Sequence, residues 1–442
     1  MSFYIVETQN QLQRLYTPEE CYINVIPLSN NYHPILSEVS LIYYKTKNQK
    51  GIIFPIKHSE GFSLDIQLIK DFILKHKTIY VLDKKQTSHL LGEEFLSEQV
   101  LDINLLSLSQ STTPPYIQDC DTSIHTHFYQ KYGDLKNVHS LIPIPKHYET
   151  QEKIYEKIVG FLDSKEHNSY YNNDYVKVFH SIEKQGITLD LPVFDVNFNP
   201  KNKKFNIKGN TIYTQYNLYN FTSRPTNSFN SINFAALPKH GEARSSIIPK
   251  NDLLFEFDYE AYHPRILAKL VDYNFGKGSV HEYLGKMYFR TENLSEEQYQ
   301  QSKELTFKQL YGGVFEQYKD IPFFKKVIEY TDEIWNKYEI KGYLELVGGR
   351  KLFEIENPTP QKLLNYKLQS GETFYNVHSI KKLQEYLDNR KTSRILLYTY
   401  DSILIDYSRN DGKETLKEIK NIMESNGFKV KIKYGINYNN LK

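Results

Sequence analysis

The stretch that most constrains the fold of this chain runs from Leu253 to Leu270 and reads LLFEFDYEAYHPRILAKL. Its first half has the period of a strand, because Leu254, Glu256 and Asp258 fall on one face and aromatic residues on the other. A helix is expected from about Pro264. A strand that ends on a carboxylate just before a loop and a helix suits a metal ligand or a general base. An acidic residue beside a helix N-terminus is the ordinary alternative, so the functional interpretation depends on a second carboxylate in a matching setting.

The composition limits where a functional surface can lie. The 442 residues carry 55 Lys+Arg and 53 Asp+Glu, a formal net charge of +2, so any nucleic-acid-binding surface must be a local patch. The two cysteines, Cys21 and Cys120, exclude a disulfide framework and a cysteine zinc site and suit a reducing cytoplasm. No apolar run approaches the roughly 18 residues of a membrane span, and Met1 to Asn10 lack a signal-peptide pattern. We therefore expect a cytoplasmic protein without a membrane partner, in the host cytoplasm if the chain is viral.

Residues 19–110 have the pattern of a compact α/β unit. Three strands are predicted in CYINVIPL, VSLIYYK and GIIFPIK, followed by a helix in IQLIKDFILKHK, a fourth strand in TIYVLD and a short helix near Thr87 to Leu91. This order resembles the RNase H-like 3′–5′ exonuclease domain that precedes many DNA polymerases. The resemblance implies a nuclease site that holds two metal ions on acidic side chains.

The acids of such a nuclease site are missing from the sequence. The site requires Asp-x-Glu on the first strand, where this chain has NVIPL from Asn24 to Leu28. After the fourth strand the chain offers Lys84 and Lys85. Asp102 is a remaining acid, but one carboxylate cannot hold two divalent ions. We therefore predict that this domain lacks 3′–5′ exonuclease activity and has a structural role.

A linker is predicted at residues 111–150, where Pro114 and Pro115 lie in a mixture of polar residues. An amphipathic helix follows, and then a second helix in YVKVFHSIEKQGITLD that ends at Gly186. This second helix resembles the segment of family A DNA polymerases in which a helix ends in Gly-Ile/Val-x-Asp at the entry to the palm. The next motif follows soon after Asp190, so most of the helical thumb of that family is expected to be missing.

Residues 212–238 resemble the Thr-Gly-Arg-Leu-Ser-Ser … Asn-Leu-Gln-Asn-Ile-Pro block of family A DNA polymerases. An arginine and amides can reach minor-groove acceptors that all base pairs share, and so they hold a duplex without reading its sequence. An ordinary loop is the alternative for this run alone. The resemblance implies DNA binding by Arg224, Asn230 and Asn233, and also by Arg244, which fits the basic residue of the family just before motif A.

The stretch from Leu253 to Leu270 then resembles motif A of the same family, Asp-Tyr-Ser-Gln-Ile-Glu-Leu-Arg. Asp258 and Tyr259 match this motif, and Arg265 falls in register. His263 takes the place of the glutamate that, in the family, excludes the 2′-hydroxyl of a ribonucleotide. The resemblance implies that Asp258 holds metal and that Tyr259 and His263 line the nucleotide site, and the histidine leaves the sugar selectivity open.

The segment SKELTFKQLYGG resembles motif B, Arg-x3-Lys-x3-Phe-x3-Tyr-Gly. Lys303, Phe307 and Tyr311 recur at steps of four residues and so share one helical face. Such a face can bind a triphosphate and cover the nascent base pair, whereas an amphipathic helix with an aromatic stripe is the alternative. Tyr299 replaces the arginine of the motif, which puts one phosphate contact of the family in doubt. His281, in GSVHEYLGKMY, matches the histidine that approaches the incoming triphosphate.

The remaining motifs follow in family order. Arg350 in ELVGGRKLF resembles part of a Gly-Arg-Arg-Arg segment, and Asn365 and Gln369 resemble the Asn-x3-Gln block, which implies DNA contacts for all three. SRILLYTYDSILIDY has the pattern of a hairpin whose tip presents Asp401, as in motif C. The family usually has His-Asp-Glu at that tip. Tyr-Asp-Ser of this chain, with Ser402 in the last place, is closer to the His-Asp-Ser of single-subunit phage-type RNA polymerases.

Together these motifs predict an α+β (mixed α/β) fold, with a right-hand polymerase palm and fingers, little thumb, and an RNase H-like exonuclease-type domain in front. The expected domains are 1–110, the linker, and a polymerase domain at 151–442 with fingers at approximately 275–350. The resemblance implies a small, phage-type DNA polymerase. Its partners would be primer-template DNA, dNTPs and a processivity or replisome protein.

The catalytic group implied by the resemblance is Asp258, Asp401 and Lys303, with the two aspartates holding two Mg²⁺ ions and Mn²⁺ as the alternative ion. Two other functions stay open. His263 and Ser402 favour an RNA polymerase or primase-like enzyme of the same superfamily. The lost nuclease acids and the missing thumb favour an inert replisome scaffold. The presence of both aspartates and the motif B lysine argues against the scaffold.

Overall fold

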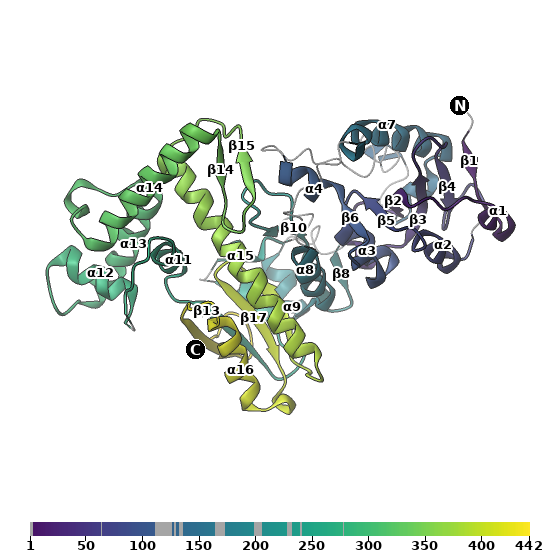
Figure 1. Cartoon of the computed structure of the whole chain (residues 1–442). Helices are drawn as coiled ribbons and strands as arrows, with labels where there is room; N and C mark the ends of the chain where they lie inside the picture. The colour runs from purple at the N-terminus through teal and green to yellow at the C-terminus, as the bar shows by residue number, and fades with distance from the viewer. Residues whose placement is uncertain are drawn as a thin grey trace.

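The computed structural model shows a six-stranded sheet near the N-terminus and a four-stranded sheet near the C-terminus, each covered by helices (Figure 1). Asn230, Cys120, Pro114 and Pro115 lie outside the described residues. The structure describes residues 3–62, 64–110, 126–127, 130–131, 136–163, 173–198, 206–227, 232–238, 241–276 and 278–442.

The N-terminal sheet has the order β1-β4-β3-β2-β5-β6, with β2, β3 and β4 antiparallel and β5 and β6 parallel to β2. Its strands are apolar almost throughout because helices cover both faces, α1 and α2 on one and α7 on the other. The predicted order of strands and helix is present. The elements are β1 (Tyr4–Ile5), α1 (Gln9–Gln13), β2 (Glu20–Pro27), β3 (Val39–Lys45), β4 (Ile52–Pro55), α2 (Ile66–Ile73), β5 (Thr78–Val81), α3 (Lys84–Leu91), β6 (Val100–Asp102), α4 (Ile103–Gln110) and α7 (Ile144–Asp163).

Helix α7 belongs by its packing to this N-terminal unit. Glu152 of α7 accepts hydrogen bonds from Tyr43 (2.7 Å) and Lys45 (2.9 Å) of β3. Gln151 accepts one from Asn24 of β2 (2.7 Å). Asn24 stands where a nuclease of this type would need a carboxylate, and α7 covers that position. The N-terminal unit therefore extends to the end of α7, later than the sequence pattern suggested.

The C-terminal sheet is antiparallel, with the order β16-β17-β13-β18. Strand β13 has the expected alternation, because Phe255, Phe257 and Tyr259 enter a core formed with α8, α15 and α16. Asp258 lies on the opposite face, which it shares with Leu254. The elements are α8 (Asn173–Gln185), β13 (Leu253–Tyr259), α15 (Pro360–Asp388), β16 (Arg394–Tyr398), β17 (Ser402–Tyr407), α16 (Lys413–Glu424) and β18 (Val430–Gly435).

A smaller sheet, of order β12-β7-β9-β8, packs on the Leu254 face of β13. Between Asp190 and Arg224 the described residues form the short helix α9 and strands of two residues, with no long helix of the kind a thumb would need. The elements are β7 (Ile187–Leu189), α9 (Leu191–Asn197), β8 (Ile207–Lys208), β9 (Thr211–Ile212), β10 (Tyr216–Asn217), β11 (Thr226–Asn227) and β12 (Ile247–Ile248).

Helices α11 to α14 and the hairpin β14–β15 form a lobe beyond β13 (Figure 1). Helix α13 begins after Ser295, which forms a capping box with Gln298, and it ends at Gly313 with φ 95°. No helix in the described ranges has the length and apolar character needed to cross a bilayer. The elements are α11 (Tyr262–Leu270), α12 (Val280–Phe289), α13 (Glu296–Gly312), α14 (Pro322–Lys341), β14 (Tyr343–Glu345) and β15 (Lys351–Phe353).

Buried polar side chains hold the N-terminal unit against the rest of the chain. Glu183 of α8 is fully buried and accepts hydrogen bonds from Lys85 (2.7 Å) and His89 (2.8 Å) of α3. Asp102, at the end of β6, accepts one from the hydroxyl of Tyr219 (2.9 Å). Such buried charges are tolerated only when each has its partner, so the two parts of the chain are expected to stay in contact.

The buried carboxyl of Asp102 predicts that stability falls as the pH rises from about 4 to about 7. Burial, and then the negative charge of Asp83, raises the pKa of Asp102 to about 7, so the folded chain keeps a proton that the unfolded chain has lost in this window. One such proton costs at most about 1.4 kcal/mol per pH unit. Asp102→Asn should reduce the dependence of the free energy of unfolding on pH, measured by urea unfolding between about pH 4 and pH 7. Asp71→Asn, on the exposed face of α2, should keep it, and an unchanged slope in Asp102→Asn would contradict the prediction.

Candidate active site

Two aspartates meet at one end of the C-terminal sheet. Asp258, the penultimate residue of β13, lies opposite Ser402 in the register of β13 and β17. Asp401 lies in the turn from β16 to β17, and its carbonyl oxygen accepts a hydrogen bond from the backbone N–H of Tyr259 (2.9 Å). The two carboxylates therefore come from neighbouring strand ends, and the hairpin tip is where the sequence pattern placed it.

Hydrogen bonds fix the turn that carries Asp401. Tyr400 has φ 69°, a left-handed conformation that is uncommon for a bulky residue. Its carbonyl oxygen accepts a hydrogen bond from the side-chain amide of Asn376 on α15 (2.7 Å). The N–H of Thr399 donates to the carbonyl of Ser402 (3.0 Å), which closes the turn. The backbone of Asp401 is thus held from both strands and from α15.

The two aspartates offer the kind of oxygen donors that Mg²⁺ prefers. Asp401 is exposed and Asp258 is half-buried, so the strand end is accessible. Among the described residues, no group of three or more His, Cys, Asp or Glu side chains is arranged to hold a metal. Mg²⁺ is commonly bound by one or two carboxylates together with substrate phosphates and water. Two aspartates are therefore a sufficient protein contribution for an ion that is shared with a substrate.

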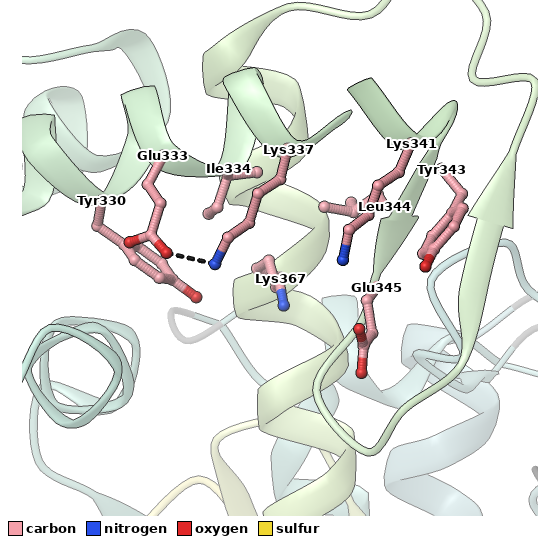
Figure 2. Close-up of a pocket in the computed structure, with 9 residues that line it drawn as sticks. All are labelled: Tyr330, Glu333, Ile334, Lys337, Lys341, Tyr343, Leu344, Glu345 and Lys367. Carbon is pink, nitrogen blue, oxygen red and sulfur yellow. Dashed lines mark hydrogen bonds and ion pairs between the residues drawn. The ribbon is translucent and has the colours of Figure 1, made fainter. Parts of the chain in front are cut away.

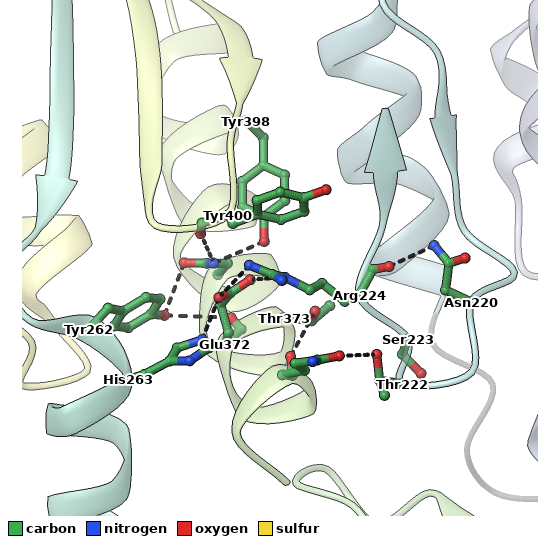
Figure 3. Close-up of polar contacts among 12 residues, drawn as sticks. Asn220, Thr222, Ser223, Arg224, Tyr262, His263, Glu372, Thr373, Tyr398 and Tyr400 are labelled. Carbon is green, nitrogen blue, oxygen red and sulfur yellow. Dashed lines mark hydrogen bonds and ion pairs between the residues drawn. The ribbon is translucent and has the colours of Figure 1, made fainter. Parts of the chain in front are cut away.

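A chain of polar contacts, the His263 relay, runs beside this strand end from α13 through α11 and α15 to the loop before β11. Figure 3 shows the part of it from His263 to Arg224. The Nε2 of His263 is 2.6 Å from the carboxylate of Glu372, and its Nδ1 is 2.5 Å from the hydroxyl of Tyr311. Arg224 donates to the same carboxylate (2.8 Å), and its guanidinium lies 3.8 Å from the ring centroid of Tyr400. The relay consists of Tyr311, His263, Glu372 and Arg224. It links the lobe of helices to the turn that carries the second aspartate.

Glu372, at the centre of the relay, was not among the predicted site residues. Burial would raise the pKa of this carboxyl, but the hydrogen bonds and charges of His263 and Arg224 outweigh burial, and the pKa is lowered. Glu372 therefore stays ionised although it is only 1% exposed. The sequence did contain a signal, because a carboxylate interrupts a series of buried positions at steps of four along α15. That series is Leu364, Leu368, Glu372, Asn376 and Ile380.

Helix α13 presents the predicted aromatic face. The rings of Phe307 and Tyr311 are partly exposed and stacked, with centroids 6.0 Å apart and planes 3° apart. One turn earlier, the ammonium of Lys303 lies 4.6 Å from the ring centroid of Tyr299. Tyr299 takes the position of the family arginine, so it positions the lysine by a cation–π contact instead of adding a second charge.

His281 lies behind this face on α12. Its ring centroid is 5.9 Å from that of Phe307 and 6.5 Å from that of Tyr299. The side chain is buried, and its Nδ1 has no hydrogen-bond partner within the described part of the chain. Burial lowers the pKa of His281 to about 4, and the charge of Lys303 acts in the same direction. At neutral pH His281 is therefore uncharged and can offer a phosphate a hydrogen bond but no positive charge.

The predicted nucleotide-binding residue Tyr259 has a buried side chain. Its side chain is 3% exposed, because the residue after Asp258 points to the core face of β13. The ring of Tyr259 stacks on Tyr262 at 4.2 Å between centroids, and the hydroxyl donates to the carbonyl of Met423 (3.1 Å). Its contribution to the site is the backbone hydrogen bond to Asp401.

The predicted DNA-binding residue Arg350 is also buried. This arginine is 1% exposed. Its Nε donates to the carbonyl of Leu108 in α4 (3.1 Å), and its Nη1 donates to the hydroxyl of Ser223 (2.6 Å). The side chain thus joins the hairpin β14–β15 to the N-terminal unit, and this burial could not be foreseen from a local Gly-Gly-Arg pattern.

The other predicted DNA-binding residues lie on α15 and in the segment between β11 and β12. Gln369 accepts a hydrogen bond from the hydroxyl of Thr222 (3.0 Å), and Asn365 lies one turn earlier on α15. Arg244 lies over the ring of a tyrosine near the C-terminus, 4.5 Å from its centroid. Asn233 is exposed before a short 3₁₀ helix. DNA binding at these four positions stays a prediction.

Comparisons with known proteins bear on the fold. No model of a known protein family matches the chain, and no curated protein matches its sequence. The chain is similar in structure to the POL domain of Pol1 from M. smegmatis, solved in complex with DNA primer-template and dNTP. The TM-score is 0.72 at 14% sequence identity, and the match covers 100% of both chains. The chain thus has a mixed α/β fold that resembles a polymerase domain.

Proposed function

We propose that this chain is a template-directed DNA polymerase that extends a primer with dNTPs. The observation that carries the proposal is the meeting of Asp258 and Asp401 at neighbouring strand ends, with Tyr259 bonded to the second aspartate (2.9 Å). The similarity to a polymerase domain that was solved with primer-template and dNTP supports the same function. On this proposal the chain is a small enzyme of the family A type, and Mg²⁺ is its metal.

Asp258 and Asp401 would hold two Mg²⁺ ions, with Mn²⁺ as a substitute. When bound, such ions activate the primer 3′-hydroxyl and stabilise the pyrophosphate leaving group. The protein's own part is to fix both carboxylates, which it does through the pairing of β13 with β17 and the hydrogen bond from Asn376 to Tyr400 (2.7 Å). Fixed acids need no rearrangement when charge develops in the reaction.

The lobe of helices would bind the triphosphate and the base pair. Lys303 would contact the phosphates as a point charge, and the neutral His281 would add a hydrogen bond. The partly exposed rings of Phe307 and Tyr311 would cover the nascent base pair by stacking. His263, held between Tyr311 and Glu372, would contact the sugar. Primer-template would lie against Arg224, Gln369 and the loop around Asn233.

His263 is the specific observation that favours a second candidate, an RNA polymerase of the same superfamily, since it replaces the glutamate that excludes ribonucleotides. Phe307 favours DNA synthesis, because phage-type RNA polymerases tend to lack an aromatic residue there. Extension of a primed template with dNTPs and rNTPs in parallel, with and without Mg²⁺, tests the proposal. Extension with dNTPs and Mg²⁺ supports it, preference for rNTPs supports the second candidate, and no extension with either substrate contradicts both.

The short stretch between Asp190 and Arg224 predicts low processivity. Without a long thumb, few side chains can follow the duplex, so the isolated chain is expected to dissociate after adding few nucleotides. A single-hit extension assay with a DNA trap measures the product length. Products of hundreds of nucleotides would contradict the prediction, and longer products in the presence of an accessory protein would identify the replisome partner that supplies the missing contacts.

A further inference from the structure

A pocket of about 150 Å³ lies in the lobe of helices, between the end of α14, strand β14 and the first half of α15 (Figure 2). Three lysines, Lys337, Lys341 and Lys367, line it together with Tyr343 and Glu345. The pocket is smaller than the roughly 300–1,000 Å³ of sites for whole small-molecule ligands. It has room for one compact group and not for a complete cofactor.

Among the described residues, Lys367 is a half-buried cation without a hydrogen-bond acceptor. Its side chain is half-buried and points into the middle of the pocket, and within the described part of the chain its ammonium donates no hydrogen bond (Figure 2). Burial lowers the pKa of Lys367, and the charge of Glu345 only partly opposes this effect. An ammonium has three donors, and leaving them unpaired in a partly buried site costs free energy.

The charges and rings around Lys367 indicate which group completes the site. Lys337 forms an ion pair with Glu333 at the rim. The ammonium groups of Lys341 and Lys351 lie 5.8 Å and 4.8 Å from the ring centroid of Tyr343, on whose ring they converge. Cations next to an aromatic ring are typical of sites that bind the backbone of single-stranded nucleic acid.

We propose that this pocket binds a phosphate group, and that the group is a phosphodiester of the unpaired template strand ahead of the active site. The second part of the proposal rests on the proposed polymerase function. A phosphate supplies several charged acceptors to Lys367 and Lys341 in a space of the right size. Lys367 and Glu372 lie on the same helix, about 7.5 Å apart along its axis at 1.5 Å per residue, so the pocket and the His263 relay share α15.

Fluorescence anisotropy tests the template assignment with two DNA duplexes, one blunt and one with an unpaired 5′ template extension. Lys367→Gln is expected to weaken binding of the extended duplex several-fold and to flatten its plot of log affinity against log salt by about 0.7. Binding of the blunt duplex should not change. Lys341→Gln, whose side chain is exposed, should act in the same direction, so the result does not depend on a buried substitution. Lys382→Gln, exposed on the same helix, is the matched control and should leave both duplexes unaffected.

Calorimetric titration of the full chain with inorganic phosphate separates the two sources of the group and does not require polymerase activity. If phosphate binds the wild type but not Lys367→Gln, while both duplexes bind the two proteins equally, the pocket takes free phosphate and the template assignment is overturned. If neither phosphate nor the extended duplex distinguishes Lys367→Gln from the wild type, the whole proposal is overturned. A chain that binds phosphate through Lys367 but extends no primer would instead contradict the proposed function, and with it the template assignment, but not the phosphate site.

Discussion

Asp258→Asn and Asp401→Asn are each expected to lower primer extension with Mg²⁺ on the order of 10³-fold or more. The amide keeps the shape of the side chain but loses the negative charge that a divalent ion requires. Each aspartate occupies its own strand end, so neither can take over the role of the other. Binding of primer-template should not weaken, because duplex affinity comes mainly from phosphate contacts by cations.

Single-turnover extension of a labelled primer measures the loss of extension, and fluorescence anisotropy measures the binding of primer-template. Asp388→Asn, an exposed position at the end of α15, makes the same chemical change away from the site and should retain wild-type extension. Wild-type extension by either site variant would remove that aspartate from the proposed metal site. A variant that loses binding as well as extension would show that the change disturbs the sheet, and thermal unfolding would detect that outcome independently.

Glu372→Ala is expected to lower the free energy of unfolding by about 3–5 kcal/mol, because it removes one partner of a buried charged group. Arg224 would lose its carboxylate (2.8 Å), and His263 would lose the partner of its Nε2 (2.6 Å). Extension should also slow, since His263 would no longer hold the hydroxyl of Tyr311 in place. Urea unfolding at neutral pH measures the loss of stability.

One further variant shows whether the charge of Glu372 or the volume of its side chain stabilises the fold, and a second variant is the control. Glu372→Gln keeps a hydrogen-bond acceptor of similar size but no charge, and an intermediate loss of stability is expected from it. Glu385→Ala, exposed on the same helix, should change stability by no more than about 0.5 kcal/mol. A loss below about 1 kcal/mol for Glu372→Ala would mean that the relay contributes little net stability and that the charge of Arg224 is solvated in another way.

Local periodicity was sufficient for the parts of the site that lie on single elements. The alternation in β13 predicted which face carries Asp258, and the steps of four residues predicted that Lys303, Phe307 and Tyr311 share a face of α13. The polar tip between two apolar runs predicted the turn at Asp401. These features depend on neighbours within a few residues, which is the information that periodicity contains.

Contacts between distant segments could not be predicted in this way. Glu372 and His263 are hydrogen-bonded although they are 109 positions apart in the sequence, and Arg350 and Leu108 although they are 242 positions apart. The same motif position can therefore hold a side chain that is exposed to DNA or one that is buried between two units of the chain. Only the tertiary packing determines which of the two applies. Tyr259 differs from these cases, because its burial followed from the strand alternation itself and the motif resemblance obscured it.

The hydrogen bond between the Tyr259 N–H and the Asp401 carbonyl has a consequence for which side chains near the two aspartates can change. Paired strands lie about 4.8 Å apart whatever side chains they carry, so the separation of the two acids is set by peptide groups. Neighbouring side chains such as those of His263 and Ser402 can therefore vary without changing that separation. The relative position of the two aspartates then depends on the backbone and not on the side chains around them.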